Sequence, residues 1–147
     1  MGNRKSSERH AESDSLIKVL IVDDSDLVRV RLKNILVDNG HLEIVGEARN
    51  SSEAIQKTKE LHPDIVILDI KIPGENGIEV LKKIKKYELP SKVIMLTNYP
   101  YPQYKQKCKE LGAELFLQKS NDFEMLPDAI ESLFRNSANA GELFYGK

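Results

Sequence analysis

Five polar side chains end or directly follow apolar runs of this sequence, and each is of a type that handles metal ions or phosphate groups. They are Asp23, Asp24, Asp69, Thr97 and Lys119. Three carboxylates held close together repel one another and resist ionising together, and a divalent cation relieves that repulsion. Mg²⁺ prefers oxygen ligands and suits phosphate chemistry. With the acids partly neutralised, a carboxylate can attack phosphorus while the hydroxyl and the ammonium hold phosphoryl oxygens.

Asp69 follows residues 65–68, which are all β-branched or Leu and do not alternate with polar residues. Such a run predicts a strand that is buried on both faces. A loop containing Pro73 and Gly74 comes after it. In open α/β sheets, ligands collect outside the carboxyl ends of the strands. Asp is also a common turn residue, so Asp69 alone supports a turn cap equally well. The joint placement of five such residues after four strands favours a site.

Strands and helices alternate along the chain. Strands are predicted at 17–22, 42–48, 64–68, 92–97 and 114–118, with the second at an edge of the sheet. Helices are predicted from Ser25 or Asp26 to Asn39, at 51–61, at 78–84, up to Leu111, and after a Ser120–Asn121 cap. This alternation predicts a doubly wound α/β fold, with a five-stranded parallel sheet and helices on both faces. The strand order 2-1-3-4-5 is taken from flavodoxin-like folds, and it would bring the polar residues together.

Composition excludes several classes of protein. The 147 residues, 40% of them hydrophobic and 31% charged, suit one globular domain. A net charge of −1 gives no basic field, so we expect no direct nucleic acid binding. Cys108 is the single cysteine, which excludes a disulfide framework and suits a reducing compartment. No apolar run is long enough to span a membrane, and residues 1–15 lack the apolar core of a secretory signal, so a cytoplasmic location is expected.

Three regions are expected. Residues 1–15 are polar and predict a disordered arm, residues 16–135 form the domain, and residues 136–147 form a tail or linker stub.

The motifs resemble those of the receiver domain, also called CheY-like, of two-component response regulators. The resemblance covers about residues 16–135 and depends on four segments: Val22–Asp24, Leu68–Gly77, Met95–Thr97 and Phe116–Ser120. It implies that Asp69 is the phosphoacceptor. It also implies a Mg²⁺ site formed by Asp24 directly, Asp23 mainly through water, Asp69, and the backbone carbonyl of Lys71.

The resemblance further implies a switch. Thr97 would be the switch hydroxyl, Lys119 the lysine that pairs with the phosphoryl group, and Phe116 the switch aromatic, which is often Tyr in the family. A sensor histidine kinase or a phosphotransfer protein would donate the phosphoryl group. The face made by the helix that ends at Leu111, the strand at 114–118 and the last helix would then gain or lose a partner, or self-associate.

Two residues are expected to tune the lifetime of the phosphoryl group. Lys71 lies two positions after Asp69, where its side chain would either pair with the phosphoryl group and slow attack by water, or point into solvent. Tyr99 lies two positions after Thr97, where its ring would restrict access to the site.

Other functions remain open. A Mg²⁺-dependent phosphohydrolase with an Asp nucleophile typically needs a second Asp two residues on, where this chain has Lys71. A receiver-like scaffold that signals without phosphate would not need the full acidic set with Thr97 and Lys119. We therefore expect no enzyme beyond one that promotes its own phosphorylation and dephosphorylation. The domain would either work alone through protein partners or be the receiver part of a DNA-binding transcriptional regulator.

Overall fold

A parallel sheet of five strands forms the centre of the molecule. The computed structural model describes residues 16–120 and 122–135. The strands are β1 (Ile17–Val22), β2 (Leu42–Ala48), β3 (Ile65–Leu68), β4 (Lys92–Thr97) and β5 (Leu115–Gln118). Their order across the sheet is β2-β1-β3-β4-β5, and every neighbouring pair is parallel. The predicted fold class and strand order are confirmed. The predicted arm at 1–15 and tail at 136–147 lie outside the described residues.

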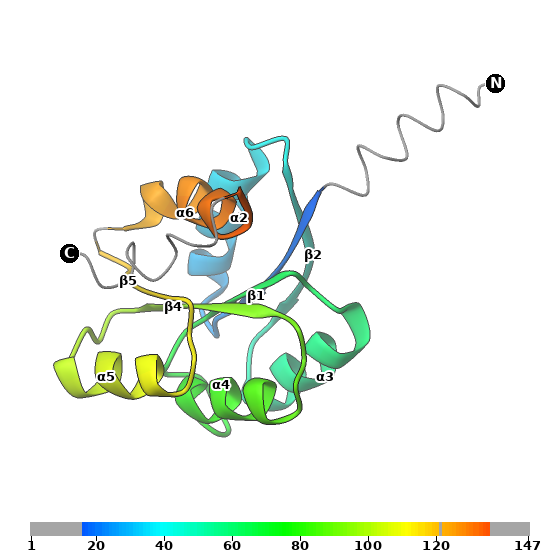
Figure 1. Cartoon of the computed structure of the whole chain (residues 1–147). Helices are drawn as coiled ribbons and strands as arrows, with labels where there is room; N and C mark the ends of the chain where they lie inside the picture. Colours follow the sequence, from blue (N-terminus) through cyan, green and yellow to red (C-terminus); the bar gives the residue numbers. More distant parts are fainter. Residues whose placement is uncertain (1–15, 121, 136–147) are drawn as a thin grey trace.

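Helices cover both faces of this sheet. They are α2 (Asp26–Val37), α3 (Ser51–Leu61), α4 (Gly77–Lys86), α5 (Pro102–Glu110), the short 3-10 helix η1 (Phe123–Met125) and α6 (Leu126–Arg135). Figure 1 shows α2 and α6 on one face, and α3, α4 and α5 on the other. Within the described ranges, none of these helices has the length and hydropathy needed to cross a membrane.

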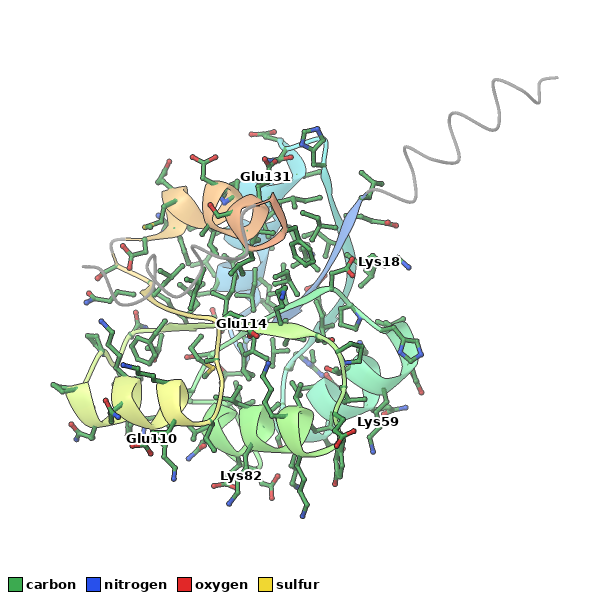
Figure 2. All side chains as sticks on the ribbon, viewed as in Figure 1. Lys18, Lys59, Lys82, Glu110, Glu114 and Glu131 are labelled. Carbon is green, nitrogen blue, oxygen red and sulfur yellow. The ribbon has the colours of Figure 1, made fainter. Side chains whose placement is uncertain are left out.

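Burial explains why the central strands are so apolar. All four residues of β3 are buried, and so are the last four residues of β1, because helices cover the sheet on both sides. Charged side chains instead occupy the outer sides of the helices. Figure 2 shows Lys59 on α3, Lys82 on α4 and Glu110 on α5 pointing away from the sheet. The helices are therefore amphipathic, and each buries one stripe against the strands.

Local sequence signals set the helix boundaries. Side-chain oxygens of Ser25, Asn50 and Asn76 cap the starts of α2, α3 and α4. Each accepts a hydrogen bond from a backbone amide three residues on, which contributes about 1 kcal/mol to helix stability. His62 (φ 50°) is the C-cap of α3, and Gly112 (φ 95°) follows the end of α5. Both residues have the left-handed conformation that commonly terminates helices.

Two details differ from the sequence predictions. The last helix is preceded by η1, whose N-cap residue is Asp122 and not the predicted Ser120–Asn121 pair. Oδ2 of Asp122 accepts a hydrogen bond from the backbone N–H of Gln118 at 2.7 Å, which closes a turn between β5 and η1. Asn121 lies outside the described residues. β2 is the predicted edge strand, but its burial does not alternate as the sequence pattern of residues 42–48 predicts. Its pairing with β1 shifts register between Val19 and Leu20.

Candidate functional site

Three carboxylates from separate parts of the chain converge at the carboxyl ends of β1 and β3. Val22 pairs with Leu68 across the two strands, so the residues that follow each of them lie side by side. One oxygen from each of Asp23, Asp24 and Asp69 lies within 4.8 Å of the other two. Asp23 and Asp69 are buried, whereas Asp24 is exposed. We call these three residues the acidic cluster.

Lys119 supplies a positive charge inside the acidic cluster. Its Nζ lies 2.6 Å from Oδ2 of Asp23 and 3.0 Å from Oδ2 of Asp69. The backbone places it there, because the N–H of Lys119 donates to the carbonyl of Thr97 at 2.9 Å where β5 leaves the sheet. Only 8% of Lys119 is exposed, so its charge depends on these carboxylates for compensation.

Burial and mutual charge shift the pKa values of this site. Burial raises the pKa of Asp69, and the neighbouring Asp23 acts in the same direction, against the opposing effect of Lys119. Burial acts to lower the pKa of Lys119, but its contacts with Asp23 and Asp69 outweigh this, so the pKa is raised and the ammonium stays protonated. Three carboxylates against one ammonium leave an excess of negative charge, which a further cation can neutralise.

The donor set fits a small hard cation. Among the described residues, Oδ1 of Asp69 is a buried side-chain oxygen with no hydrogen-bond partner. Native structures rarely leave such a group unsatisfied without a functional reason. One oxygen from each of Asp23 and Asp24 also lies close to a carboxylate oxygen of Asp69, and Mg²⁺ prefers oxygens of this kind.

The start of α4 packs directly on the backbone of Asp69, which sequence reasoning missed. The N–H of Gly77 donates to the carbonyl of Ile70 at 2.7 Å. A Cβ atom on Gly77 would lie 2.0 Å from the carbonyl oxygen of Asp69. Only glycine allows this approach, so residue 77 fixes the backbone that carries Asp69. The Asn76–Gly77 pair signals a turn in sequence, but the contact depends on the fold.

The two predicted switch residues lie on β4 and β5. Thr97 is fully buried, and its Oγ1 accepts the backbone N–H of Tyr99 at 3.0 Å. Phe116 is 9% exposed and pairs with Met95 in the sheet. The Phe116 ring therefore lies inward without the hydroxyl that a tyrosine would carry.

Lys71 lies at the edge of the site, beside aromatic rings. Its side chain is exposed, and its Nζ lies over two aromatic rings, 5.3 Å from the ring centroid of Tyr99 and 5.7 Å from that of Tyr104. Tyr101 packs between the same two rings, with centroid distances of 6.1 and 5.3 Å. Tyr99 was among the predicted site residues, whereas Tyr104 was not. Tyr104 lies on α5, and its helical position between Tyr101 and Cys108 was the available signal.

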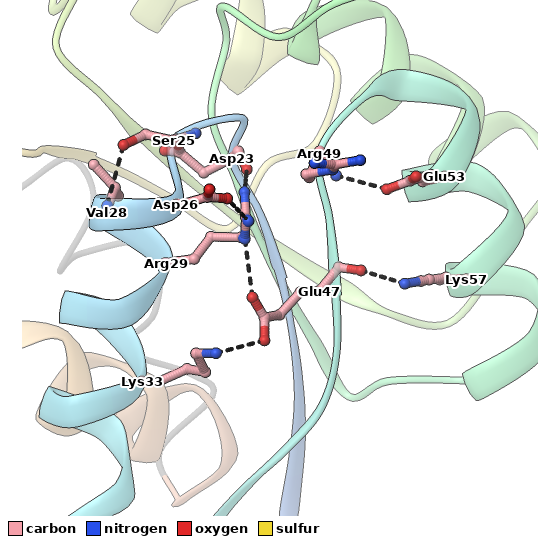
Figure 3. Close-up of polar contacts among 10 residues, drawn as sticks. All are labelled: Asp23, Ser25, Asp26, Val28, Arg29, Lys33, Glu47, Arg49, Glu53 and Lys57. Carbon is pink, nitrogen blue, oxygen red and sulfur yellow. Dashed lines mark hydrogen bonds and ion pairs between the residues drawn. The ribbon is translucent and has the colours of Figure 1, made fainter.

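Arg29 is a third missed residue beside the site. It is 8% exposed, and its Nη1 donates to the carbonyl of Asp23 at 2.7 Å (Figure 3). Its position on α2, in line with the buried Leu32 and Leu36, was the sequence signal for a buried charge.

Comparison with known proteins places the chain in a family. The model of the response regulator receiver domain matches residues 19–131. The chain therefore belongs to the response regulator receiver domain family, which confirms the resemblance inferred from its motifs. Receiver domains of this family serve signalling.

Individual relatives support the same assignment. Response regulator GacA of Pseudomonas syringae pv. syringae is 34% identical over 119 residues, which cover 81% of this chain and 56% of GacA. Transcriptional regulatory protein LnrK of Bacillus subtilis is 40% identical over 116 residues, which cover 78% of this chain and 52% of LnrK. The chain thus spans about half the length of these relatives.

A solved structure is similar along most of the chain. The CheX–CheY–BeF3–Mg complex from Borrelia burgdorferi contains a chain with a TM-score of 0.74 and 32% identity, covering 80% of this chain and 89% of that one.

Proposed function

We propose that Asp69 accepts a phosphoryl group from a phosphohistidine of a sensor histidine kinase or a phosphotransfer protein. One observation carries the proposal. Oδ2 of the buried Asp69 is held by Lys119 at 3.0 Å, whereas its Oδ1 has no hydrogen-bond partner among the described residues. The two oxygens of one carboxylate therefore have different environments, and the unpartnered one is available for bond formation.

Mg²⁺ is the cofactor that we propose for this site. Asp23, Asp24 and Asp69, with the backbone carbonyl of Lys71, would hold the ion. The clustering of the three carboxylate oxygens within 4.8 Å supports this ligand set. The similar CheY complex from Borrelia burgdorferi contains Mg and BeF3. The bound ion would relieve repulsion among the carboxylates and stabilise the negative charge of the transferring phosphoryl group.

The transfer step needs no proton from this chain. An electron pair on Asp69 forms the new O–P bond, and the P–N bond to the donor imidazole breaks with its electron pair going to nitrogen. The donor ring leaves as neutral imidazole when its other nitrogen carries a proton from solvent. The product is an acyl phosphate on Asp69. Lys119 keeps its proton, because its contacts raise its pKa, and it pairs with a phosphoryl oxygen as a fixed positive charge. The activation barrier of the transfer is lowered further when the donor is held in line with Asp69 and water is excluded.

The phosphoryl group then biases a two-state switch. Thr97 would release the amide of Tyr99 and bond the phosphoryl group, and Phe116 would occupy the space behind it. The face formed by α5, β5 and α6 would change its affinity for a downstream protein or for a second copy. A dianion can shift this equilibrium only by its difference in affinity for the two states.

Three further assignments belong to the same proposal. Residues 16–135 would form the receiver domain, and the chain would work in the cytoplasm. It would act on no separate substrate, because position 71, two residues after Asp69, holds a lysine that lies over Tyr99 and Tyr104 and supplies no carboxylic acid. An Asp-nucleophile phosphohydrolase would need such an acid to release its product.

A second candidate is that this domain is the receiver part of a DNA-binding transcriptional regulator. The observation that favours it is that LnrK, a transcriptional regulatory protein, matches over 52% of its own length. Sedimentation velocity tests it through oligomeric state. This candidate is supported if the phosphorylated chain self-associates and if reversing charges on α5 abolishes that self-association. A phosphorylated chain that stays monomeric and captures a different protein supports the domain acting through protein partners.

Intact-mass measurement tests the main proposal. The chain is incubated with acetyl phosphate and Mg²⁺, and compared with Asp69→Asn and with the control Asp38→Asn, an exposed carboxylate at the end of α2. The native chain and the control should gain one phosphoryl group, and EDTA should prevent the gain. An equal gain in Asp69→Asn would refute the proposal. Steady release of phosphate from a simple phosphate ester would instead support the hydrolase.

A further inference from the structure

Arg29 joins three segments beside the acidic cluster. Its Nη1 donates to the carbonyl of Asp23 at 2.7 Å, its Nε donates to Oε1 of Glu47 at 2.9 Å, and its Nη2 contacts Asp26. Figure 3 shows the guanidinium between the loop after β1, the start of α2 and the end of β2. A guanidinium is always charged and offers five donors in a fixed plane, so it can hold several acceptors at once.

The carbonyl bonded by Arg29 belongs to the peptide unit that links Asp23 to Asp24. Because a peptide unit is planar, fixing this oxygen also fixes the direction in which the chain leaves toward Asp24. The preceding peptide unit is held as well, since the N–H of Asp23 donates to the carbonyl of Ala48 at 3.0 Å. Oδ1 of Asp23 accepts the N–H of Ser25 at 2.9 Å. The backbone on both sides of Asp23 is thus held by hydrogen bonds.

Glu47 holds Arg29 in this position. Oε1 of Glu47 accepts from Arg29, and its Oε2 lies 2.7 Å from Nζ of Lys33. The contact with Lys33, followed by that with Arg29, lowers the pKa of Glu47, so this carboxylate stays ionised. The network reaches α3 too, because Lys57 donates to the backbone carbonyl of Glu47.

We propose that Arg29, held by Glu47, is a positioning residue that orients the Asp23–Asp24 peptide so that both carboxylates can hold a divalent cation. This inference depends on the proposed Mg²⁺ site. Arg29 would contact neither the ion nor the phosphoryl group. It would act by keeping the ligands in one arrangement, which binding sites need to within fractions of an ångström.

Charge and position predict opposite effects for this residue, which makes the proposal testable. Arg29 is a cation beside a cation site, so electrostatics alone predict that its removal strengthens Mg²⁺ binding. Positioning predicts weaker binding. Groups that orient metal ligands typically cost 10- to 100-fold in affinity when they are removed. The sign of the change therefore separates the two explanations.

The test is calorimetric titration of Mg²⁺ into the metal-free chain. Arg29→Gln should bind Mg²⁺ about tenfold more weakly than the native chain. The matched control is Arg31→Gln, which removes the same charge from the same helix; Arg31 is exposed and lies 4.3 Å from the ring centroid of Phe123. The control should bind as tightly as the native chain or slightly more tightly. Arg29→Lys keeps the charge but loses the planar fork, and should give an intermediate affinity.

Each result has a defined meaning. Circular dichroism establishes that each variant is folded at the titration temperature, and Arg29→Lys decides the question if Arg29→Gln is not. The inference is overturned if the Mg²⁺ affinity follows charge alone. In that case Arg29→Gln binds as tightly as Arg31→Gln, and Arg29→Lys binds as tightly as the native chain. If the native chain itself binds no Mg²⁺, the proposed metal site fails instead.

Discussion

Replacing Asp69 with Asn should stabilise the metal-free protein, although it removes the residue that we propose as phosphoacceptor. At an effective dielectric constant of about 20, repulsion between Asp69 and Asp23 at the 4.8 Å limit is about 3.5 kcal/mol. Asp24 is exposed and adds about 1 kcal/mol. Attraction to Lys119 at 3.0 Å is about 5.5 kcal/mol, so the charge terms almost cancel. The cost of burying the carboxylate then decides the sign.

Asn removes that cost, and its uncharged amide oxygen can still accept a hydrogen bond from the ammonium of Lys119. Lys119 remains compensated by Asp23 at 2.6 Å. We expect Asp69→Asn to gain about 1 kcal/mol, which raises the melting temperature of a domain of this size by about 4 °C. The measurement is thermal unfolding followed by circular dichroism, in EDTA at low ionic strength.

Addition of Mg²⁺ should reverse the order of stability. A ligand at tenfold its dissociation constant stabilises the native chain by about 1.4 kcal/mol, whereas Asp69→Asn, with one ligand lost, gains less. The reasoning is refuted if Asp69→Asn melts below the native chain in EDTA. Equal stabilisation of both proteins by Mg²⁺ would show that Asp69 does not hold the ion.

Three further predictions follow from single contacts. In the metal-free state, the stability advantage of Asp69→Asn over the native chain should grow as the pH rises above 3.8, the ordinary pKa of Asp. The pKa of Asp69 is raised in the folded chain, so ionising this carboxyl costs more there than in the unfolded chain. Melting curves at several pH values test this. Gly77→Ala should cost at least about 2 kcal/mol in chemical unfolding, because the backbone cannot yield, whereas Gly40→Ala, with open space around it, should change little. Cys108 is buried, and burial raises the pKa of its thiol to about 11. A thiol reagent should therefore label Cys108 of the native chain only after the chain unfolds.

Sequence patterns predicted the architecture because burial imposes them. Residues 65–68 are uniformly apolar since β3 is covered on both faces, and the polar residue after them had to fall at the sheet edge. Ser25, Asn50 and Gly112 mark helix ends through local chemistry, which requires no knowledge of distant contacts. The convergence of the polar residues needed one further input, the strand order, which came from known folds and not from this sequence.

Residues whose role depends on a distance escaped the sequence analysis. Nothing in the Asn76–Gly77 turn indicates that the glycine lies against the carbonyl of Asp69. Arg29 is in line with the buried Leu32 and Leu36, but that spacing does not indicate that its guanidinium bonds the backbone carbonyl of Asp23. The orientation of Lys71 was undecided because the two aromatic rings that it covers come from the next segment and from α5.

Lys119 gives the resting protein an internal counter-ion. Its ammonium already bridges Asp23 and Asp69, so the two buried acids remain ordered when the surrounding solution supplies no metal. If Mg²⁺ is the bound ion, as we propose, its loss would prevent phosphorylation and leave the domain folded. A substitution of Lys119 would therefore affect the stability of the metal-free domain as well as the proposed phosphorylation, because one side chain serves both.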